Sequence, residues 1–218
     1  MKLIEDDVKN EIREFFKDAG SVDVVAILDK SSENCHYCDY IKQMLEEVKE
    51  LYPLLSLQIH EKLTPELQKK YSIEIDEVPV IFIHGSNEGI VAYRGIPSGY
   101  EFGLFIETLK ELSISHTHLD PKIVNELKNI NKDVTIKVYV TPTCPYCPSA
   151  GAVAYSFASL NPKIKSYVIE VTEFQEEGTK NNISVVPTII VNDKVKFQGA
   201  LPPEMFLKKV KEAIDDRR

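Results

Sequence analysis

A duplicated arrangement of cysteines and prolines limits the folds open to this chain. All four cysteines of the 218-residue sequence stand in two Cys-x-x-Cys motifs, and Cys144 lies 109 residues after Cys35. A Val-Pro pair follows each motif, and Pro187 lies 108 residues after Pro79. Two kinds of landmark that repeat with nearly the same spacing indicate two copies of one structural unit. The chain has the length for two domains of about 100 residues each.

The hydrophobic pattern of each copy predicts the same order of helices and strands. In the first copy we expect helix, strand, helix, strand, short helix, two hairpin strands and helix at residues 7–19, 22–28, 37–51, 54–60, 64–71, 79–83, 89–94 and 99–112. In the second we expect them at 121–130, 134–140, 145–160, 164–171, 173–181, 188–191, 194–198 and 203–214. Strand–helix–strand spacing predicts a right-handed crossover with parallel strands, and each hairpin adds antiparallel ones.

The boundary between the copies falls near residues 115–119, which predicts units 1–117 and 118–218. Asp120-Pro121 then supplies an N-cap and a first-turn proline for the next helix.

Charge and hydropathy exclude several functional classes. The net charge is −8, and the sequence has no evident basic face that could neutralise phosphates, so we expect no nucleic-acid partner. No apolar run approaches the roughly 20 residues of a membrane span, and the first residues lack the apolar core of a signal peptide. We therefore expect a cytoplasmic protein without a membrane partner. The absence of Trp and the Glu/Lys-rich helices are compatible with a thermophile.

The spacing of the cysteines predicts reversible disulfide chemistry. Two thiols separated by two residues at a helix start can close into a small disulfide and open again. Unpaired N–H groups and the positive end of the helix dipole stabilise a thiolate there, so Cys35 and Cys144 are the predicted nucleophiles. Cys38 and Cys147 lie one turn further on, and we expect them to be better buried and to resolve the mixed disulfide.

These motifs, the Val-Pro pairs and a glycine before each final helix (Gly95, Gly199) resemble the thioredoxin superfamily. The tandem arrangement is similar to the glutaredoxin-like protein disulfide oxidoreductases of thermophilic archaea and bacteria, which are related to protein disulfide isomerase. The resemblance implies an α/β fold class with two tandem thioredoxin-like folds, each a central mixed sheet flanked by helices. Ala200 stands where glutaredoxins place a second glycine for glutathione, which argues against glutathione as the obligate reductant.

The resemblance also implies a substrate site and an electron source. Pro79 and Pro187 should be cis, and Val78 and Val186 should hold an extended substrate through their backbones. The expected partners are proteins with thiols or disulfides, and a thioredoxin reductase-like flavoprotein that brings electrons from NADPH. We expect no bound cofactor and no metal beyond the redox-active disulfides.

Proton transfer to the buried second cysteine needs a nearby acid or base. Asp29 and His60 occupy roughly the positions of the buried acidic–basic pair of thioredoxin, and Lys137 and Glu170 hold the corresponding positions in the second unit. An alternative interpretation makes all four solvated residues at strand ends.

Together these observations predict a protein disulfide oxidoreductase that reduces, oxidises and isomerises protein substrates. The second pair should carry more of the activity, because Cys144-Pro145-Tyr146-Cys147 is the glutaredoxin motif. One alternative is a thioredoxin- or glutaredoxin-like electron carrier to a peroxiredoxin. Alternatives of another class are a structural zinc protein with four cysteine ligands and a non-catalytic binding module. Dithiol potentials span roughly −270 to −120 mV, so the motifs leave the direction of electron flow open.

Overall fold

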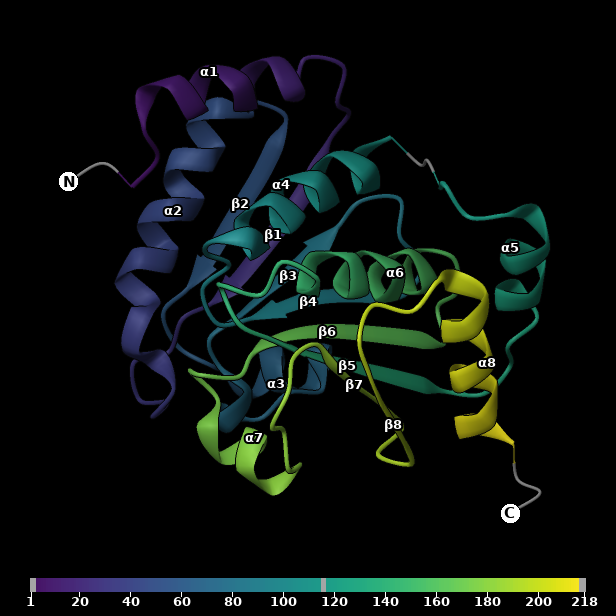
Figure 1. Cartoon of the computed structure of the whole chain (residues 1–218). Coiled ribbons are helices and arrows are strands. Elements are labelled where there is room, and N and C mark those ends of the chain that lie inside the picture. The colour runs from purple at the N-terminus through teal and green to yellow at the C-terminus, as the bar shows by residue number, and fades with distance from the viewer. Residues whose placement is uncertain (1–2, 115–116, 216–218) are drawn as a thin grey trace.

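The computed structural model of the chain describes residues 3–114 and 117–215 and consists of two similar units (Figure 1). The helices and strands of the first unit are α1 (Asp6–Phe15), β1 (Val22–Ile27), α2 (Cys38–Leu51), β2 (Leu55–His60), α3 (Pro65–Tyr71), β3 (Val80–His84), β4 (Ile90–Arg94) and α4 (Tyr100–Ser113). Those of the second are α5 (Pro121–Lys128), β5 (Val134–Val140), α6 (Cys147–Ser159), β6 (Ile164–Glu170), α7 (Gln175–Lys180), β7 (Thr188–Val191), β8 (Val195–Gln198) and α8 (Pro203–Ile214). Every expected element is present within a few residues. Residues 115–116 of the predicted boundary lie outside the described residues.

The two four-stranded sheets join edge to edge into a single eight-stranded sheet. Its strand order is β2-β1-β3-β4-β6-β5-β7-β8, so each unit contributes one contiguous half. Within each half the first two strands are parallel and the hairpin is antiparallel, as the spacing predicted. The halves meet where β4 pairs with β6 in parallel, from Ile90 opposite Lys165 to Arg94 opposite Ile169.

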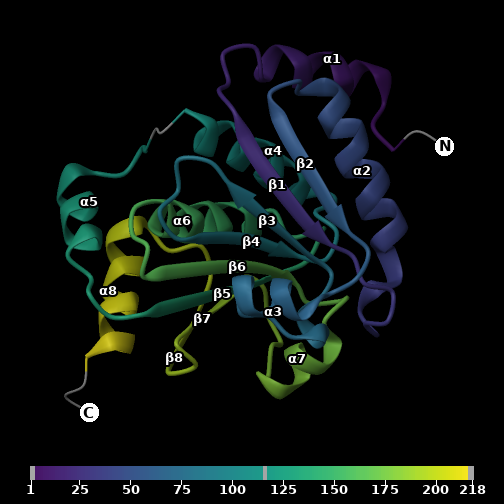
Figure 2. The same cartoon turned by 180° about the vertical axis from the view of Figure 1, so that it is seen from behind.

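Helices cover both faces of this sheet. The core on one face contains side chains of α2, α4, α6 and α8, and the core on the other contains Leu67 and Tyr71 of α3 and Phe174 just before α7. Figures 1 and 2 show α4 and α6 on the opposite side of the sheet from α3. Adjacent strand residues such as Val24 and Val25 enter different cores, because side chains alternate between faces along a strand. No helix among the described residues is long and apolar enough to cross a membrane.

Local sequence signals explain where the helices begin. The side chain of Asp120 accepts a hydrogen bond from the N–H of Lys122 at 2.7 Å, with Pro121 as the first residue of α5, so the predicted N-cap is confirmed. The helix α4 begins after Gly99, whose φ of 58° favours glycine. A Cβ at Gly99 would lie 2.3 Å from the carbonyl oxygen of Pro142, so this glycine also allows α4 to approach the second cysteine motif closely.

The units also contact each other along α4 and α6. The hydroxyl of Tyr155 on α6 donates to the carbonyl of Ala92 on β4 at 2.8 Å. The N–H of Gly89, just before β4, donates to the carbonyl of Ala158 at 2.9 Å. A Cβ at Gly89 would lie 2.1 Å from the carbonyl oxygen of Ile164 and 2.6 Å from that of Asn161. The backbone of the first unit therefore touches the backbone of the second with no room for a side chain.

We predict that Gly89→Ala lowers the free energy of unfolding by about 1–3 kcal/mol, the usual cost of overpacking a close contact. The atoms in the way are backbone carbonyls, which cannot turn aside as a flexible side chain would. Gly103→Ala is the matched control, because Gly103 faces open space on α4. That change should stabilise the protein by up to about 1 kcal/mol. Urea unfolding measures both, and equal effects of the two variants would contradict the interpretation.

Candidate active sites at the two cysteine pairs

Each Cys-x-x-Cys motif lies between the end of a strand and the start of a helix. The four sulfur atoms pair within the motifs, as Cys35–Cys38 with a Cα–Cα distance of 5.2 Å and Cys144–Cys147 with one of 5.5 Å. Cys35 stands in a short 3₁₀ turn, Cys35–Tyr37, that leads into α2, and Cys147 is the first residue of α6. Both motifs thus place the first cysteine just before a helix N-terminus, where unpaired N–H groups favour a thiolate.

The two cysteines of each pair differ in burial. Cys38 is 2% exposed and Cys147 is 0% exposed, whereas Cys144 is 8% exposed and Cys35 is half-buried. The expected order of burial is therefore confirmed in both units. It leaves the first cysteine of each pair as the one that an external sulfur can reach.

The cis-proline loops lie in equivalent places in the two units. The Val78-Pro79 and Val186-Pro187 bonds are both cis, as predicted. Behind each, a glycine at the end of the hairpin donates to the proline carbonyl, Gly95 to Pro79 at 3.0 Å and Gly199 to Pro187 at 2.9 Å.

The residues before the two prolines differ in their hydrogen bonds. The carbonyl of Val78 accepts from the hydroxyl of Ser32 at 2.7 Å, and its N–H donates to the carbonyl of Ile75 at 3.3 Å. Val78 is completely buried, whereas Val186 is only partly buried. Across the described ranges, neither backbone group of Val186 has a hydrogen-bond partner. The second site therefore offers free backbone groups and the first does not.

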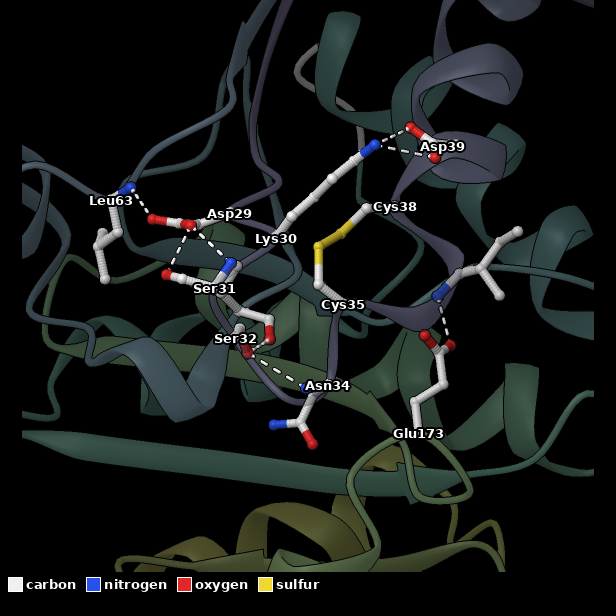
Figure 3. Close-up of a disulfide and its surroundings, with 12 residues drawn as sticks. Asp29, Lys30, Ser31, Ser32, Asn34, Cys35, Cys38, Asp39, Leu63 and Glu173 are labelled. Carbon is white, nitrogen blue, oxygen red and sulfur yellow. Dashed lines mark hydrogen bonds and ion pairs between the residues drawn. A yellow bond between two sulfur atoms is a disulfide. The ribbon is translucent and has the colours of Figure 1, made fainter.

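Of the two predicted residues Asp29 and His60, Asp29 orders a loop beside the first motif. The carboxylate of Asp29 accepts from the N–H and hydroxyl of Ser31 at 2.9 and 2.7 Å and from the N–H of Leu63 at 2.8 Å (Figure 3). Burial alone would raise the pKa of Asp29, but the hydrogen bonds from Leu63 and Ser31 outweigh it and hold that pKa below its usual value. His60 ends β2 half-buried, and its carbonyl accepts from the N–H of Leu28.

The structure does not bring the predicted pair Lys137 and Glu170 together. Val140, opposite Glu170 on the neighbouring strand, packs in the core with α6, while Tyr139 and Tyr167 belong to the other face. Lys137, an odd number of positions before Val140, faces away from that core and lies 3.7 Å from Glu177. Glu170 is 1% exposed and accepts from the hydroxyl of Thr172 at 2.6 Å and from the N–H of Glu173 at 2.9 Å. Strand alternation separates the two charges.

A buried carboxyl group that the sequence reasoning missed lies beside the second motif. Glu101 is 0% exposed, and neither of its oxygens has a hydrogen-bond partner among the described residues. It belongs to the first turn of α4, where the N–H of Tyr100 donates to the carbonyl of Pro142, two residues before Cys144. Burial raises the pKa of Glu101 to about 8, with a further contribution from the charge of Glu170. A signal existed in the sequence, because Glu101 stands in the apolar stripe of its helix with Leu104 and Leu112.

A second buried carboxyl reaches across to the first site. Glu173, between β6 and α7, is 5% exposed and accepts a hydrogen bond from the N–H of Ile96 at 2.7 Å. Burial raises the pKa of Glu173 to about 7; the Ile96 hydrogen bond opposes this rise and the charge of Glu170 adds to it. Figure 3 draws Glu173 in the surroundings of the Cys35–Cys38 disulfide, although it comes from the other unit.

A buried arginine ties the two units together near this point. Arg94, at the end of β4, is 2% exposed, and its guanidinium lies 2.7 Å from the carboxylate of Glu177 and 4.3 Å above the ring of Phe174. It also donates to the carbonyl of Glu77 at 3.1 Å and to that of Asp76 at 3.3 Å. The loop before Pro79 is therefore fixed to the second unit by a charge that is both paired and hydrogen-bonded.

Comparison with known proteins gives matches over the whole chain. Residues 134–212 match the family described as Thioredoxin domain. The chain is 29% identical to the NADH dehydrogenase of Bacillus subtilis (strain 168) over 81% of its own length, and 25% identical to the F subunit of alkyl hydroperoxide reductase of Staphylococcus aureus (strain MRSA252) over 98%. It spans 33% and 39% of the length of these two relatives.

A solved structure extends the similarity to both units. The protein disulfide oxidoreductase of Aeropyrum pernix K1 is 27% identical, with a TM-score of 0.85 over 96% of this chain and 93% of that one. The match includes both halves of the joined sheet, and each half of the present chain carries a cysteine pair before a helix. The chain is a tandem thioredoxin-fold protein with two Cys-x-x-Cys sites, similar to the disulfide oxidoreductase of Aeropyrum pernix and to part of the F subunit of alkyl hydroperoxide reductase.

Proposed function

We propose that the chain is a protein disulfide oxidoreductase whose two cysteine pairs exchange disulfides with thiol-containing partners. The observation that carries this proposal is the repeated placement of a cysteine pair before a helix in a tandem fold that also contains two cis-proline loops. Cys35 and Cys144 act as nucleophiles, because they precede a helix N-terminus and are the less buried members of their pairs. Cys38 and Cys147 then resolve the mixed disulfides.

The second site has free backbone groups to which a polypeptide substrate can bind during disulfide exchange. An extended substrate can add as a strand to the free backbone N–H and carbonyl of Val186, which brings its disulfide towards Cys144. Pro187 fixes the loop behind Val186 through the hydrogen bond from Gly199. Val78 and Pro79 hold the equivalent positions in the first unit, but the carbonyl of Val78 is already bonded to Ser32.

The buried Glu101 is the proposed proton source for the second pair. When Cys147 attacks the mixed disulfide it must first lose a proton, and when the pair is reduced it must regain one. Near neutral pH a carboxyl with a pKa of about 8 is mostly protonated and can give its proton to the Cys147 thiolate, and its ionised fraction can accept the proton that Cys147 loses before it attacks. This role replaces the one that the sequence suggested for Lys137, which faces the other side of the sheet.

The relatives favour a pyridine nucleotide as the ultimate electron source. They are named as an NADH dehydrogenase and as the F subunit of alkyl hydroperoxide reductase, and the present chain matches 33% and 39% of their lengths. We therefore propose a flavoprotein reductase, driven by NADPH or NADH, as the partner that delivers electrons to the cysteine pairs. The same similarity supports a second candidate function, the transfer of those electrons to a peroxide-reducing protein.

We predict that Cys144→Ser lowers insulin reduction far more than Cys35→Ser does. The physical reason is the free backbone of Val186, which lets an extended chain dock beside Cys144, whereas the backbone of Val78 is occupied. The measurement is insulin turbidity with dithiothreitol as the reductant, corrected for the rate without protein. A loss at Cys35 equal to or greater than the loss at Cys144 would contradict this ranking.

We predict that Glu101→Gln stabilises the protein at pH 9 and changes its stability little at pH 4. The pKa of Glu101 is about 8 in the folded chain and 4.5 in a model peptide, so the folded state binds the extra proton between these values. Stability therefore falls as the pH rises from about 4.5 to 8, and the Glu101→Gln change removes that loss, which is on the order of a few kcal/mol. Urea unfolding at both pH values measures it.

The exposed Glu107 of the same helix provides the control. Glu107→Gln should change the free energy of unfolding by a small amount that is similar at pH 4 and at pH 9. If Glu101 supplies the proton, Glu101→Gln also removes a step near pH 8 from the rate of insulin reduction by the second pair. A pH profile of that rate identical to the parent would restrict Glu101 to a structural role.

A further inference from the structure

The first cysteine pair lies beside a docking edge whose polar groups are already satisfied within the chain. Ser32, three residues before Cys35, is 7% exposed, and its hydroxyl donates to the carbonyl of Val78 at 2.7 Å. The same hydroxyl accepts from the N–H of Asn34 at 3.3 Å, a contact drawn in Figure 3. Because the N–H of Val78 is bonded to Ile75, both backbone groups that would receive an added strand are engaged.

A carboxyl group of the second unit covers the other side of this edge. Glu173 accepts from the N–H of Ile96, the residue after Gly95, and a Cβ placed on Gly95 would lie 2.6 Å from its Oε1. Gly95 in turn donates to the carbonyl of Pro79, so Glu173 lies directly over the backbone that supports the cis-proline loop. The dashed line at Glu173 in Figure 3 is the Ile96 hydrogen bond.

The equivalent positions of the second unit are open. Thr141 corresponds to Ser32 in its motif, but its side chain makes no hydrogen bond to Val186 in the described part of the chain. A Cβ at Gly199, which corresponds to Gly95, would meet no atom of the described residues within 4 Å. Ala200, which corresponds to Ile96, is exposed. Two copies of one fold thus differ at three equivalent places around the cis-proline loop.

A cavity large enough for small molecules lies next to the first pair. A cavity of about 1270 Å³ opens between the units next to the first motif, with Ser32, Asn34 and His36 on one wall and Glu173 and Phe174 on the other. Cys35 is half-buried, and Asn34 and His36 on either side of it line this cavity. A small disulfide needs no strand pairing to react, whereas a polypeptide does.

We propose that Ser32 and Glu173 are specificity-determining residues that restrict the Cys35–Cys38 pair to low-molecular-weight thiols and disulfides and leave polypeptides to the Cys144–Cys147 pair. This inference rests on the proposed function. In the reducing direction the Cys35 thiolate attacks one sulfur of a small disulfide RSSR, which breaks the RS–SR bond and releases one RS⁻. The Cys38 thiolate then attacks the Cys35 sulfur, which releases the second RS⁻ and leaves the Cys35–Cys38 disulfide. Two electrons pass from the dithiol to RSSR.

The test uses full-length chains that keep one pair each. The first-pair chain carries Cys144→Ser and Cys147→Ser, and the second-pair chain carries Cys35→Ser and Cys38→Ser. Each is fully reduced, freed of reductant, and mixed with either 2-hydroxyethyl disulfide or insulin. Acid quenching, alkylation and mass spectrometry then count the thiols that remain at each time.

The neutral 2-hydroxyethyl disulfide avoids attraction or repulsion by the acidic residues of the cavity. The readout is the ratio of the insulin rate to the 2-hydroxyethyl disulfide rate, which cancels differences in thiol reactivity.

We expect this ratio to be at least about tenfold lower for the first-pair chain than for the second-pair chain. To dock at the first site, an extended polypeptide must break the hydrogen bond from Ser32 to the carbonyl of Val78, and it meets Glu173 over Gly95. In the first-pair chain, Ser32→Ala and Glu173→Ala should each raise the ratio several-fold and leave the 2-hydroxyethyl disulfide rate within about twofold. Thr141→Ala is the matched control in the second-pair chain and should leave the ratio unchanged. Circular dichroism and the small-disulfide rate report whether each variant is folded, and the two variants test the inference independently.

Equal ratios for the two parent chains would overturn the restriction while leaving the proposed function intact. Unchanged ratios in both folded variants would overturn the roles of Ser32 and Glu173. If neither chain reduces either disulfide, the proposed function fails and the inference fails with it.

Discussion

Parallel pairing of β4 with β6 holds the two units together and positions both candidate sites. It joins two four-stranded sheets at edges that would otherwise expose unpaired N–H and carbonyl groups. It also places the backbone of Gly89 against that of Ile164 and positions Arg94 within reach of Glu177. Two folds that could each be a separate domain therefore share one sheet and one continuous core along α4 and α6.

Because of this pairing, each unit places a buried carboxyl group near the cysteine motif of the other unit. The first unit sends Glu101 to the vicinity of the second motif, and the second unit sends Glu173 to the edge beside the first motif. Both side chains are buried and have raised pKa values, mainly because burial disfavours the charged form. Buried carboxyl groups without ion-pair partners lower stability, and such groups concentrate at functional sites. The pairing of the sheets thus makes each candidate site depend on both units.

Much of the fold follows from local signals. The repeat of the Cys-x-x-Cys and Val-Pro landmarks, with the alternation of apolar residues, predicts the described α-helices and strands to within a few residues, because these depend on neighbours in the sequence. The same signals predict that Cys38 and Cys147 are buried. The resemblance to the thioredoxin superfamily implies the cis bonds before Pro79 and Pro187. The prediction that Lys137 and Glu170 form a pair was wrong, since strand alternation sends them to opposite faces. Glu101 could have been suspected from its place in an apolar stripe, but nothing local links it to Cys144.

The amino-acid sequence is enough to predict two similar units with a cysteine pair in each, because the repeated landmarks and the periodicity of apolar residues need no knowledge of tertiary contacts. The resemblance to the thioredoxin superfamily then implies the fold of each unit. The inequality of the two sites arises from the packing of the folded chain. The hydrogen bond from Ser32 to Val78 spans 46 residues and that from Ile96 to Glu173 spans 77, so both depend on contacts between distant segments. The edge pairing of β4 and β6 has no local signature either, since any edge strand offers the same backbone groups to a partner.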